Sequence, residues 1–272
     1  MNITMKGNHL VVETDDYINL DYSLDCGQSF RWKKSENIWQ AVAFGKKISI
    51  EQKDENTLFF YDTTEDDFEK IWKIYFDFER DYKTILSRFE NDSYLYEAIK
   101  KYRGIRVLNQ EPWEAICSFI ISQNNNIPRI KGIIDRLCET FGEDLGDGFY
   151  SFPSAEKIAE LTAEDLAPLR SGFRAKYILD AAKKVAEKEI DFDSIYINDI
   201  SYGREELMKI KGVGPKVAEC ALLYGFKKSD AFPVDVWVKR IMSELYPDGI
   251  PACAYPEIGI AQQYLFHWRR NV

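Results

Sequence analysis

Short apolar stretches alternate with polar positions along residues 9–62, and this two-residue period predicts β-strands. The stretches are rich in β-branched and aromatic residues and are separated by turn-like breaks such as SEN and KDEN. Because connections this short join antiparallel neighbours, we expect one antiparallel sheet. The four stretches are HLVVETDD (9–16), SFRWKK (29–34), IWQAVAFGKKISIEQ (38–52) and TLFFYD (57–62).

The pattern changes at Thr64, where Thr64-Glu65-Asp66-Asp67 resembles a helix capping box. Apolar residues then recur at helical spacing, and helical patterns continue to the end of the chain. The predicted fold class is α+β: an N-terminal antiparallel β-sheet domain with trailing helices (residues 1–92), then a larger all-helical region (93–272). The boundary is soft, between residues 80 and 105. The main helices are expected at 113–121, 127–141, 174–187, 207–210, 216–224, 236–245 and 258–268.

The composition is that of an ordinary globular protein, with 45% hydrophobic and 30% charged residues among 272. No stretch approaches the roughly 20 apolar residues that span a bilayer, and the N-terminus has no apolar signal core. We therefore expect a cytoplasmic monomer with no membrane partner. Five cysteines without a C-x-x-C spacing argue against a zinc or iron–sulfur site, so we expect free, mostly buried thiols and neither metal nor cofactor.

The net charge of −9 argues at first against a nucleic-acid partner, but the charge is unevenly distributed. Residues 1–100 carry 13 basic and 20 acidic side chains, whereas residues 207–240 carry 7 basic and 3 acidic ones, a local charge of +4. A basic patch on an acidic protein still binds phosphate, with less long-range attraction.

The segment LMKIKGVGPKVAEC (207–220) predicts two helices joined by a glycine-rich turn. A short helix would end at Gly212, and Pro215 would occupy the first turn of the next helix, where its missing N–H is tolerated. Gly212 and Gly214, on either side of Val213, permit positive φ and the close approach of another backbone. The unpaired N–H groups at the start of the second helix would then hold a phosphate. The alternative is a plain turn between packed helices, and the local positive charge favours the DNA-binding hairpin.

Lys216 would lie in the first turn of that second helix, where the helix dipole disfavours an ammonium. Attack on a sugar carbon requires the unprotonated amine, so this position suits a nucleophile. The alternative is a lysine that only contacts phosphate. Asp235, 19 residues later in FPVDVWVKR, precedes a predicted helix and would cap it. A capping carboxylate is held rigidly, which also suits stabilising a cationic sugar.

The GVGPKVA hairpin followed by PVD resembles the helix-hairpin-helix (HhH-GPD) glycosylase superfamily. Two further motifs resemble the 8-oxoguanine DNA glycosylase/AP lyase family within it: GQSFRW (27–32) and SQNNNIPRI (122–130). The resemblance covers most of the chain, with the motifs in the family's order. It implies a bifunctional enzyme that flips 8-oxoguanine out of duplex DNA, excises it and cuts the strand by β-elimination, associated with the nucleoid when it acts.

The resemblance also implies a role for individual residues. Lys216 would attack C1′ and form a Schiff base, and Asp235 would stabilise the developing positive charge. The Gly27 carbonyl would accept the N7–H that only the oxidised guanine carries, because N7 of guanine is an acceptor. The remaining base-binding residues would be Cys220, Gln262, Phe266 and Pro233; the DNA-binding residues would be Asn124, which fills the vacated space, Arg129 and Arg174 at the opposite cytosine, Gly212, Val213, Gly214 and Trp237.

Each of these pocket and DNA contacts has a plainer alternative, such as core packing for Phe266 and Cys220, or phosphate contacts for the two arginines. Two positions depart from the family pattern. Trp237 replaces a histidine two residues after the aspartate, and Phe173 replaces a tyrosine beside Arg174, so preference for cytosine opposite the lesion is expected to be weaker. Two other functions compete: excision of another base, such as an alkylated purine, and a non-enzymatic hairpin module that only binds DNA.

Overall fold

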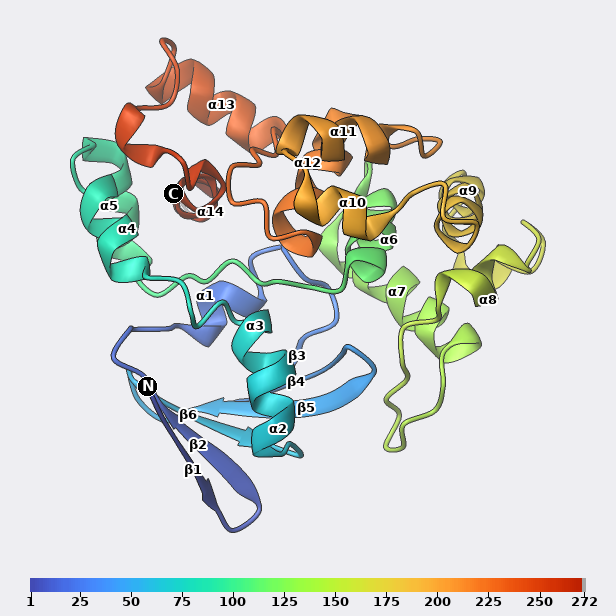
Figure 1. Cartoon of the computed structure of the whole chain (residues 1–272), viewed down its shortest axis with the longest axis horizontal. Coiled ribbons are helices and arrows are strands. Elements are labelled where there is room, and N and C mark those ends of the chain that lie inside the picture. Colours follow the sequence, from blue (N-terminus) through green and yellow to red (C-terminus); the bar gives the residue numbers. More distant parts are fainter. Residues whose placement is uncertain (271–272) are drawn as a thin grey trace.

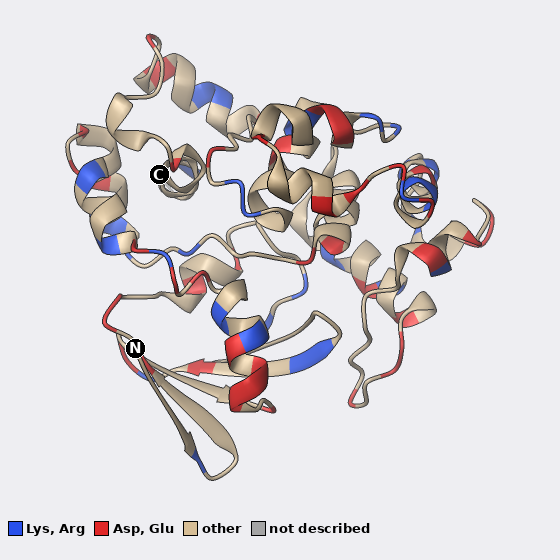
Figure 2. Cartoon of the chain, in the orientation of Figure 1, with Lys and Arg blue, Asp and Glu red and all other residues tan. Residues whose placement is uncertain are grey.

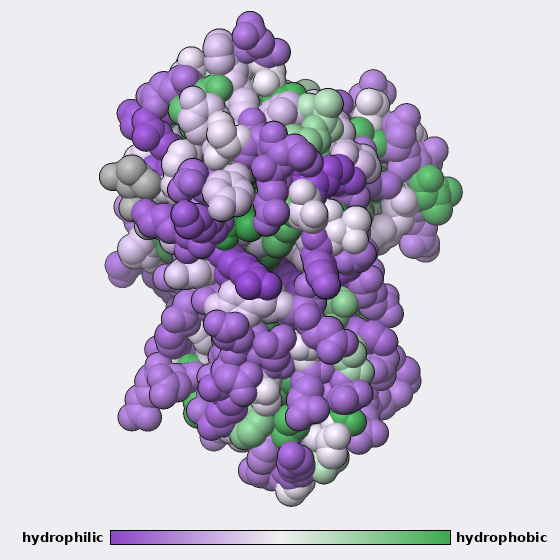
Figure 3. All heavy atoms as spheres, turned by 90° about the vertical axis from the view of Figure 1, so that its left-hand side faces the viewer, coloured by the Kyte–Doolittle hydropathy of each residue, from purple (hydrophilic) through white to green (hydrophobic). Residues whose placement is uncertain are grey.

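The computed structural model describes residues 1–270 as a β-sheet at one end of the molecule and a larger helical part at the other (Figure 1). Seen from the side, a waist separates the larger upper half from the smaller lower half, and most of that face is hydrophilic (Figure 3). The sheet is entirely antiparallel, in the order β1-β2-β6-β5-β4-β3. Its strands are β1 (Asn2–Lys6), β2 (His9–Glu13), β3 (Lys33–Ser35), β4 (Ile38–Ala43), β5 (Lys46–Gln52) and β6 (Thr57–Tyr61).

Helices account for most of the chain after Thr64, whose side chain accepts a hydrogen bond from the Asp67 N–H as predicted. The segment from α2 to α3 is one continuous helical stretch that contains a π-helical turn and lies over the sheet (Figure 1). The helical elements are α1 (Leu20–Leu24), α2 (Glu65–Asp67), η1 (Phe68–Trp72), α3 (Lys73–Tyr75), α4 (Tyr82–Phe89), α5 (Ser93–Lys101), α6 (Pro112–Ser122), α7 (Ile127–Phe141), α8 (Ala155–Ala159), η2 (Ala167–Leu169), α9 (Arg174–Ala186), α10 (Phe192–Ile197), α11 (Ile200–Met208), α12 (Pro215–Gly225), α13 (Val236–Leu245), η3 (Ala252–Ala254) and α14 (Ile258–Arg270).

Two hydrophobic cores hold these elements together. The smaller core lies on one face of the sheet, where Trp32, Trp72 and Phe76 pack against residues of the strands. The larger core fills the helical part, and it includes Ile85 and Phe89 of α4, which packs beside α5 and η3. Part of the segment that we assigned to the first domain thus packs with the helices; the division between residues 92 and 93 stays a prediction.

The α+β prediction is confirmed, but one predicted strand is wrong. Of residues 29–34, only the last two lie in a strand, and β3 runs from Lys33 to Ser35. The reason is that the side chains before it serve both halves of the molecule: Phe30 enters the helical core, whereas Trp32 lies in the sheet core and donates to the Tyr75 hydroxyl at 2.9 Å. This segment packs into both cores and joins the sheet only from Lys33, which pairs with Gln40.

Other differences are smaller. β1, an edge strand with mostly exposed side chains, alternates polar and apolar residues over only five positions and was missed. The helix before the hairpin runs from Ile200 to Met208, earlier than predicted. All five cysteines are free thiols, and four of them are buried, as expected. None of the helices within residues 1–270 has the length and apolar character needed to cross a membrane.

Candidate active site

A small cavity of about 60 Å³ brings together both predicted catalytic residues and all five predicted base-binding residues. Residues far apart in the sequence meet here, because the loop before β3, the start of α12, the start of α13 and the middle of α14 converge. The cavity lies below the usual range of ligand pockets, about 300–1,000 Å³, so a purine enters only if side chains shift. The predicted residues that line it are Gly27, Lys216, Cys220, Pro233, Asp235, Gln262 and Phe266.

Lys216 occupies the first turn of α12 and is partly buried. Its Nζ lies 3.4 Å from the Ser122 hydroxyl oxygen and 5.4 Å from the centre of the Phe119 ring, both on α6. α12 packs along α6, which fixes the direction of the lysine side chain. No carboxylate forms an ion pair with Lys216 among residues 1–270.

Gly212 and Gly214 of the hairpin have different roles. Gly212 has φ +82°, and a Cβ there would lie 2.3 Å from the Tyr177 ring, so only glycine fits. Gly214 caps α12 with φ −101°, which any residue adopts, so the positive φ that glycine permits is used only at Gly212 of the two. A Cβ on Gly214 would meet nothing within 4 Å, so the surface above it is open. The N–H groups of Gly212, Gly214 and Lys216 have no partner within residues 1–270, as a phosphate cradle requires.

Asp235 caps α13 as predicted: its Oδ1 accepts a hydrogen bond from the Val238 N–H at 2.8 Å. The segment that leads to Asp235 is held by a residue that the sequence analysis missed. Glu219, three residues after Lys216 on α12, is buried and accepts from the Phe232 N–H at 2.7 Å and from Arg204 at 2.5 Å. Glu219 therefore ties the segment that leads to Asp235 to the helix that carries Lys216.

The base-binding residues combine polar and apolar groups. Gly27 has φ +88°, which glycine adopts without strain. Gln262 is buried, and its Nε2 lies 3.4 Å from the Pro233 carbonyl oxygen. Burial raises the pKa of the Cys220 thiol to about 11, so it stays neutral and does not compete with the lysine as a nucleophile near neutral pH. Phe266 is partly exposed, unlike the buried residues that precede it on α14.

Four further residues line the cavity, and none was predicted: Cys26, Phe119, Tyr224 and Gln263. Phe119 lies between Lys216 and Tyr224, because its ring stacks on Tyr224 with centres 5.2 Å apart. Gln263 donates to Tyr224 and to Gln262. Phe119 and Tyr224 lie on apolar helix faces, a context that indicates only core packing.

The three asparagines in the loop between α6 and α7 make different contacts. Asn126 caps α7 through the Arg129 N–H, and Asn125 bonds back to the Ile121 carbonyl. Asn124 is exposed, has φ +46°, and its side chain makes no hydrogen bond within the described part of the chain. Asn124 is therefore the one that is available to DNA.

The two arginines assigned to the opposite base differ in their surroundings. Arg174 is only 3% exposed and donates to the carbonyls of Gln123, Asn124 and Ser171, so it holds the loop that carries Asn124. Burial lowers its pKa, and the nearby charge of Arg129 adds to this effect. Arg129 is exposed. Contact of either guanidinium with a cytosine stays a prediction.

The charged surface around the hairpin agrees with the basic window. Figure 2 shows Lys or Arg residues in the loop after α11, on α9 and on α13. Lys211, Lys239 and Arg240 are exposed and form no salt bridge within residues 1–270. Trp237 is 37% exposed at the start of α13, with Arg240 5.2 Å from its ring centre. Positive groups thus flank the hairpin, as a backbone-binding surface requires.

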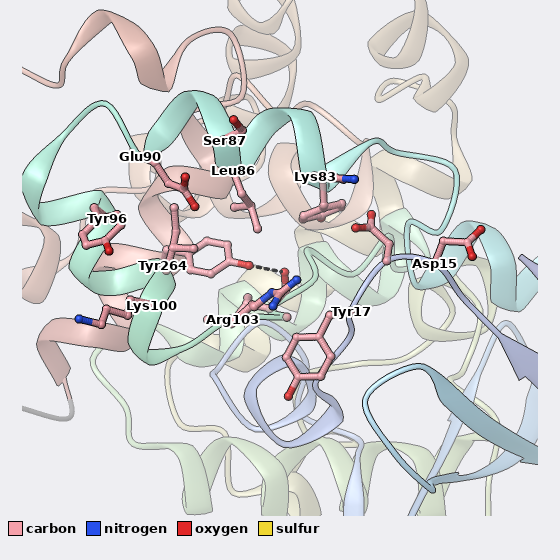
Figure 4. Close-up of a pocket in the computed structure, with 15 residues that line it drawn as sticks. Asp15, Tyr17, Lys83, Leu86, Ser87, Glu90, Tyr96, Lys100, Arg103 and Tyr264 are labelled. Carbon is pink, nitrogen blue, oxygen red and sulfur yellow. Dashed lines mark hydrogen bonds between the residues drawn. The ribbon is translucent and has the colours of Figure 1, made fainter.

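A larger cavity of about 670 Å³ lies elsewhere, between the loop after β2 and helices α4 and α5 (Figure 4). Lys83 and Glu90 border it from α4, Arg103 and Tyr17 lie opposite, and the Tyr264 hydroxyl donates to the Ile105 carbonyl. Lys83 lies at the start of α4, but none of the acidic residues that line this cavity caps the start of a helix. Size alone therefore does not identify the reactive site, and the predicted catalytic residues line the smaller cavity. Within residues 1–270 no three His, Cys, Asp or Glu side chains are arranged to hold a metal ion.

Comparison with known proteins agrees with this geometry. The family model described as 8-oxoguanine DNA glycosylase, N-terminal domain, matches residues 10–116, and the HhH-GPD superfamily base excision DNA repair protein model matches residues 117–249. The N-glycosylase/DNA lyase of Saccharomyces cerevisiae is 35% identical over 251 residues, which are 82% of this chain and 67% of that protein. The chain belongs to the 8-oxoguanine DNA glycosylase family.

Solved structures of this glycosylase family extend the likeness to the whole chain. MBOgg1 in complex with a low-affinity DNA ligand is 40% identical, with a TM-score of 0.92, over 99% of this chain and 98% of that one. The 8-oxoguanine glycosylase/lyase of Clostridium acetobutylicum, in complex with double-stranded DNA containing cytosine opposite 8-oxoG, is 35% identical, with a TM-score of 0.92, over 100% and 98% of the two chains. The chain is thus a base excision repair enzyme.

Proposed function

We propose that this glycosylase excises 8-oxoguanine from duplex DNA and then cuts the strand, with Lys216 as the nucleophile and Asp235 as its carboxylate partner. The observation that carries the assignment is the meeting of both side chains in one cavity with the predicted base-binding residues. The relatives named N-glycosylase/DNA lyase and 8-oxoguanine glycosylase/lyase support the same activity. The protein acts as a cytoplasmic monomer, at the nucleoid.

The chemistry follows from the two groups. The unprotonated Nζ of Lys216 forms a bond to C1′ while the bond between C1′ and the base breaks, and the electron pair leaves with the base. The negative charge of Asp235 stabilises the positive charge that develops on the sugar. Opening of the sugar ring turns the lysine adduct into a Schiff base. Loss of a C2′ proton then expels the 3′ phosphate, which is β-elimination.

Recognition of the lesion uses the other side of the cavity. The Gly27 carbonyl accepts the N7–H of 8-oxoguanine, and guanine offers only an acceptor there. Gln262 contacts the Watson–Crick edge, while Phe266 and the neutral Cys220 thiol lie on the two faces of the base. Because the cavity is small, Phe266, whose side chain is partly exposed, moves to admit the base.

One incubation tests the proposed function. A duplex with one 8-oxoguanine opposite cytosine, labelled at the 5′ end, is incubated with the enzyme, and half of each sample is treated with alkali. We expect cleavage in both halves, because the lyase cuts without alkali. Cleavage only after alkali would leave a glycosylase without lyase activity, and binding without either product would leave the DNA-binding module. A faster reaction on an alkylated purine would reassign the substrate.

Phe266→Ala should weaken binding to the lesion duplex by about 1–3 kcal/mol, the range for loss of one aromatic stack on a base. Phe266 and Gln262 lie four residues apart and therefore on one face of α14. The measurement compares the Kd for lesion and undamaged duplexes. Phe59, which stacks on His9 in the sheet, offers a matched control, because Phe59→Ala removes a ring outside the site. Unchanged affinity in the Phe266 variant would contradict the stacking role.

Arg129→Ala should reduce the preference for cytosine opposite the lesion, because a contact to one base is worth about 1–3 kcal/mol. The exposed Arg129 is free to reach the base, whereas Arg174 already donates to three carbonyls. The measurement is the excision rate with each of the four bases opposite 8-oxoguanine. Phe173 supplies no hydroxyl there, so the wild-type preference is modest. Equal rates opposite all four bases in the wild type would contradict the arginine assignment, and an undiminished preference without Arg129 would transfer the role to Arg174.

A further inference from the structure

Behind the cavity, a chain of hydrogen bonds connects three residues that have no assigned role. Gln263 donates from Nε2 to the Tyr224 hydroxyl and, at 2.9 Å, to Oε1 of Gln262, while the Cys26 Sγ lies 3.7 Å from its Oε1. All four side chains are buried. Buried polar groups keep such partners because an unpaired one is costly, so the amide of Gln263 has one orientation.

The orientation of Gln263 is secured at its oxygen end. Burial raises the pKa of Cys26 to about 12, so the thiol keeps its hydrogen and can donate. That hydrogen is shared between Oε1 of Gln263 and the Ser23 carbonyl, 3.4 Å away. If Gln263 were reversed, its NH₂ group would meet the thiol, and its oxygen would face the oxygen of Gln262. The observed arrangement avoids the contact between the two oxygens and lets the thiol donate to Oε1.

The orientation of Gln262 follows from that of its neighbour. Because Gln263 presents an N–H, Gln262 must present Oε1 to it, and its Nε2 then faces the Pro233 carbonyl at 3.4 Å. One lone pair of Oε1 and one N–H of Nε2 remain without a partner within residues 1–270. A donor and an acceptor in a fixed order thus remain for the base that enters the cavity.

We propose that Gln263 is a positioning residue that fixes the amide of Gln262 in the orientation that selects a guanine-type over an adenine-type Watson–Crick edge. This inference rests on the proposed function. At positions 6 and 1, a guanine edge presents an acceptor and then a donor, whereas an adenine edge presents a donor and then an acceptor. A glutamine that can flip pairs with either edge, and one that is held pairs with one. Since 8-oxoadenine carries the same N7–H, the Gly27 carbonyl cannot reject it, and Gln262 has to.

The decisive variant replaces the donor that Gln263 presents to Gln262 by an acceptor and keeps a side chain of similar size. In Gln263→Glu, assayed at a pH at which the new carboxyl is ionised, the carboxylate only accepts, so Gln262 is driven to present Nε2 instead of Oε1. The Cys26 thiol and the Tyr224 hydroxyl can both donate to the carboxylate, so the buried groups remain paired. Gln262 loses its contact with Pro233, but at 3.4 Å that bond is long, and a bond to a charged acceptor outweighs it.

The test compares excision rates of 8-oxoguanine and 8-oxoadenine, each opposite cytosine, and uses their ratio. A general loss of stability lowers both rates, whereas a flipped amide changes the ratio. We expect the ratio to fall about tenfold or more in Gln263→Glu, the size of one lost bidentate contact. In Gln263→Met, which frees the Gln262 amide, the fall should be smaller. Tyr224→Phe removes one bond of the network but leaves the bond from Gln263 to Gln262, so the wild-type ratio should persist.

The outcomes separate this inference from the proposed function. If the wild type does not excise 8-oxoguanine, the proposed function fails. If the wild type excises it and both Gln263 variants keep the wild-type ratio, the positioning role is overturned. If Gln263→Glu does not fold, Gln263→Met decides, and an unchanged ratio there overturns the role. An equal fall in Tyr224→Phe would also overturn it, because the effect would then belong to the packing of the site.

Discussion

Lys216→Gln should abolish strand cutting and borohydride trapping while leaving binding to a lesion duplex largely intact. Glutamine has no nucleophilic amine, and no other lysine lines the cavity within residues 1–270. The side chain makes few contacts: Nζ lies 3.4 Å from the Ser122 hydroxyl oxygen and 5.4 Å from the centre of the Phe119 ring. The measurements are cleavage without alkali, the yield of reduced enzyme–DNA adduct, and the Kd for the lesion duplex.

A control separates this effect from the loss of a positive charge on the hairpin. Lys211 lies on the same hairpin, is exposed, and does not line the cavity. Lys211→Gln should weaken binding in a salt-dependent manner and keep the adduct. If Lys216→Gln formed the adduct at wild-type yield, another amine would be the nucleophile.

Asp235→Asn should slow base excision by about 10²- to 10³-fold, comparable to removing one group that stabilises charge in a transition state. Asparagine caps helices about as well as aspartate, so the bond to the Val238 N–H can persist while the charge is lost. Stability should change by less than about 1 kcal/mol. Single-turnover excision and thermal unfolding are the two measurements.

Asp199 provides the matched control for this cap. It caps α11 in the same manner, accepting from the Tyr202 N–H at 2.9 Å, but it is not part of the cavity. Asp199→Asn should therefore leave excision unchanged. Wild-type excision in Asp235→Asn would reduce Asp235 to a helix cap, and equal losses in both variants would indicate an effect of cap exchange on the fold.

The fold could be predicted wherever one local pattern determined one element. The capping residues Thr64 and Asp235 and the period of α7 and α13 each identified a helix boundary. Prediction failed where a side chain packs against residues that are far away in the sequence. Residues 29–32 look like a strand, but Phe30 and Trp32 enter different cores, a fact that no local periodicity contains.

The candidate site shows the same limit. Lys216 and Asp235 could be found because glycine, proline and capping residues mark unusual backbone positions, whereas Gly27 was found only through the resemblance of its motif to the family. Glu219 and Gln263 could not, because each is a buried polar residue whose partners come from distant segments: Phe232 and Arg204 for Glu219, and Cys26 for Gln263. The sequence also left open which of the two properties each hairpin glycine uses: Gly212 adopts a positive φ, whereas Gly214 leaves open space above the backbone.

The most direct measurement is the identity of the residue that carries the sugar after reduction. Wild-type enzyme is incubated with an 8-oxoguanine duplex in the presence of borohydride, digested with protease and nuclease, and mapped by mass spectrometry. The account predicts that the reduced adduct lies on the peptide containing Lys216, with no adduct on the N-terminal amine or on Lys211. An adduct on any other amine, or 8-oxoguanine release with no adduct at all, would contradict the assignment of Lys216 as the nucleophile.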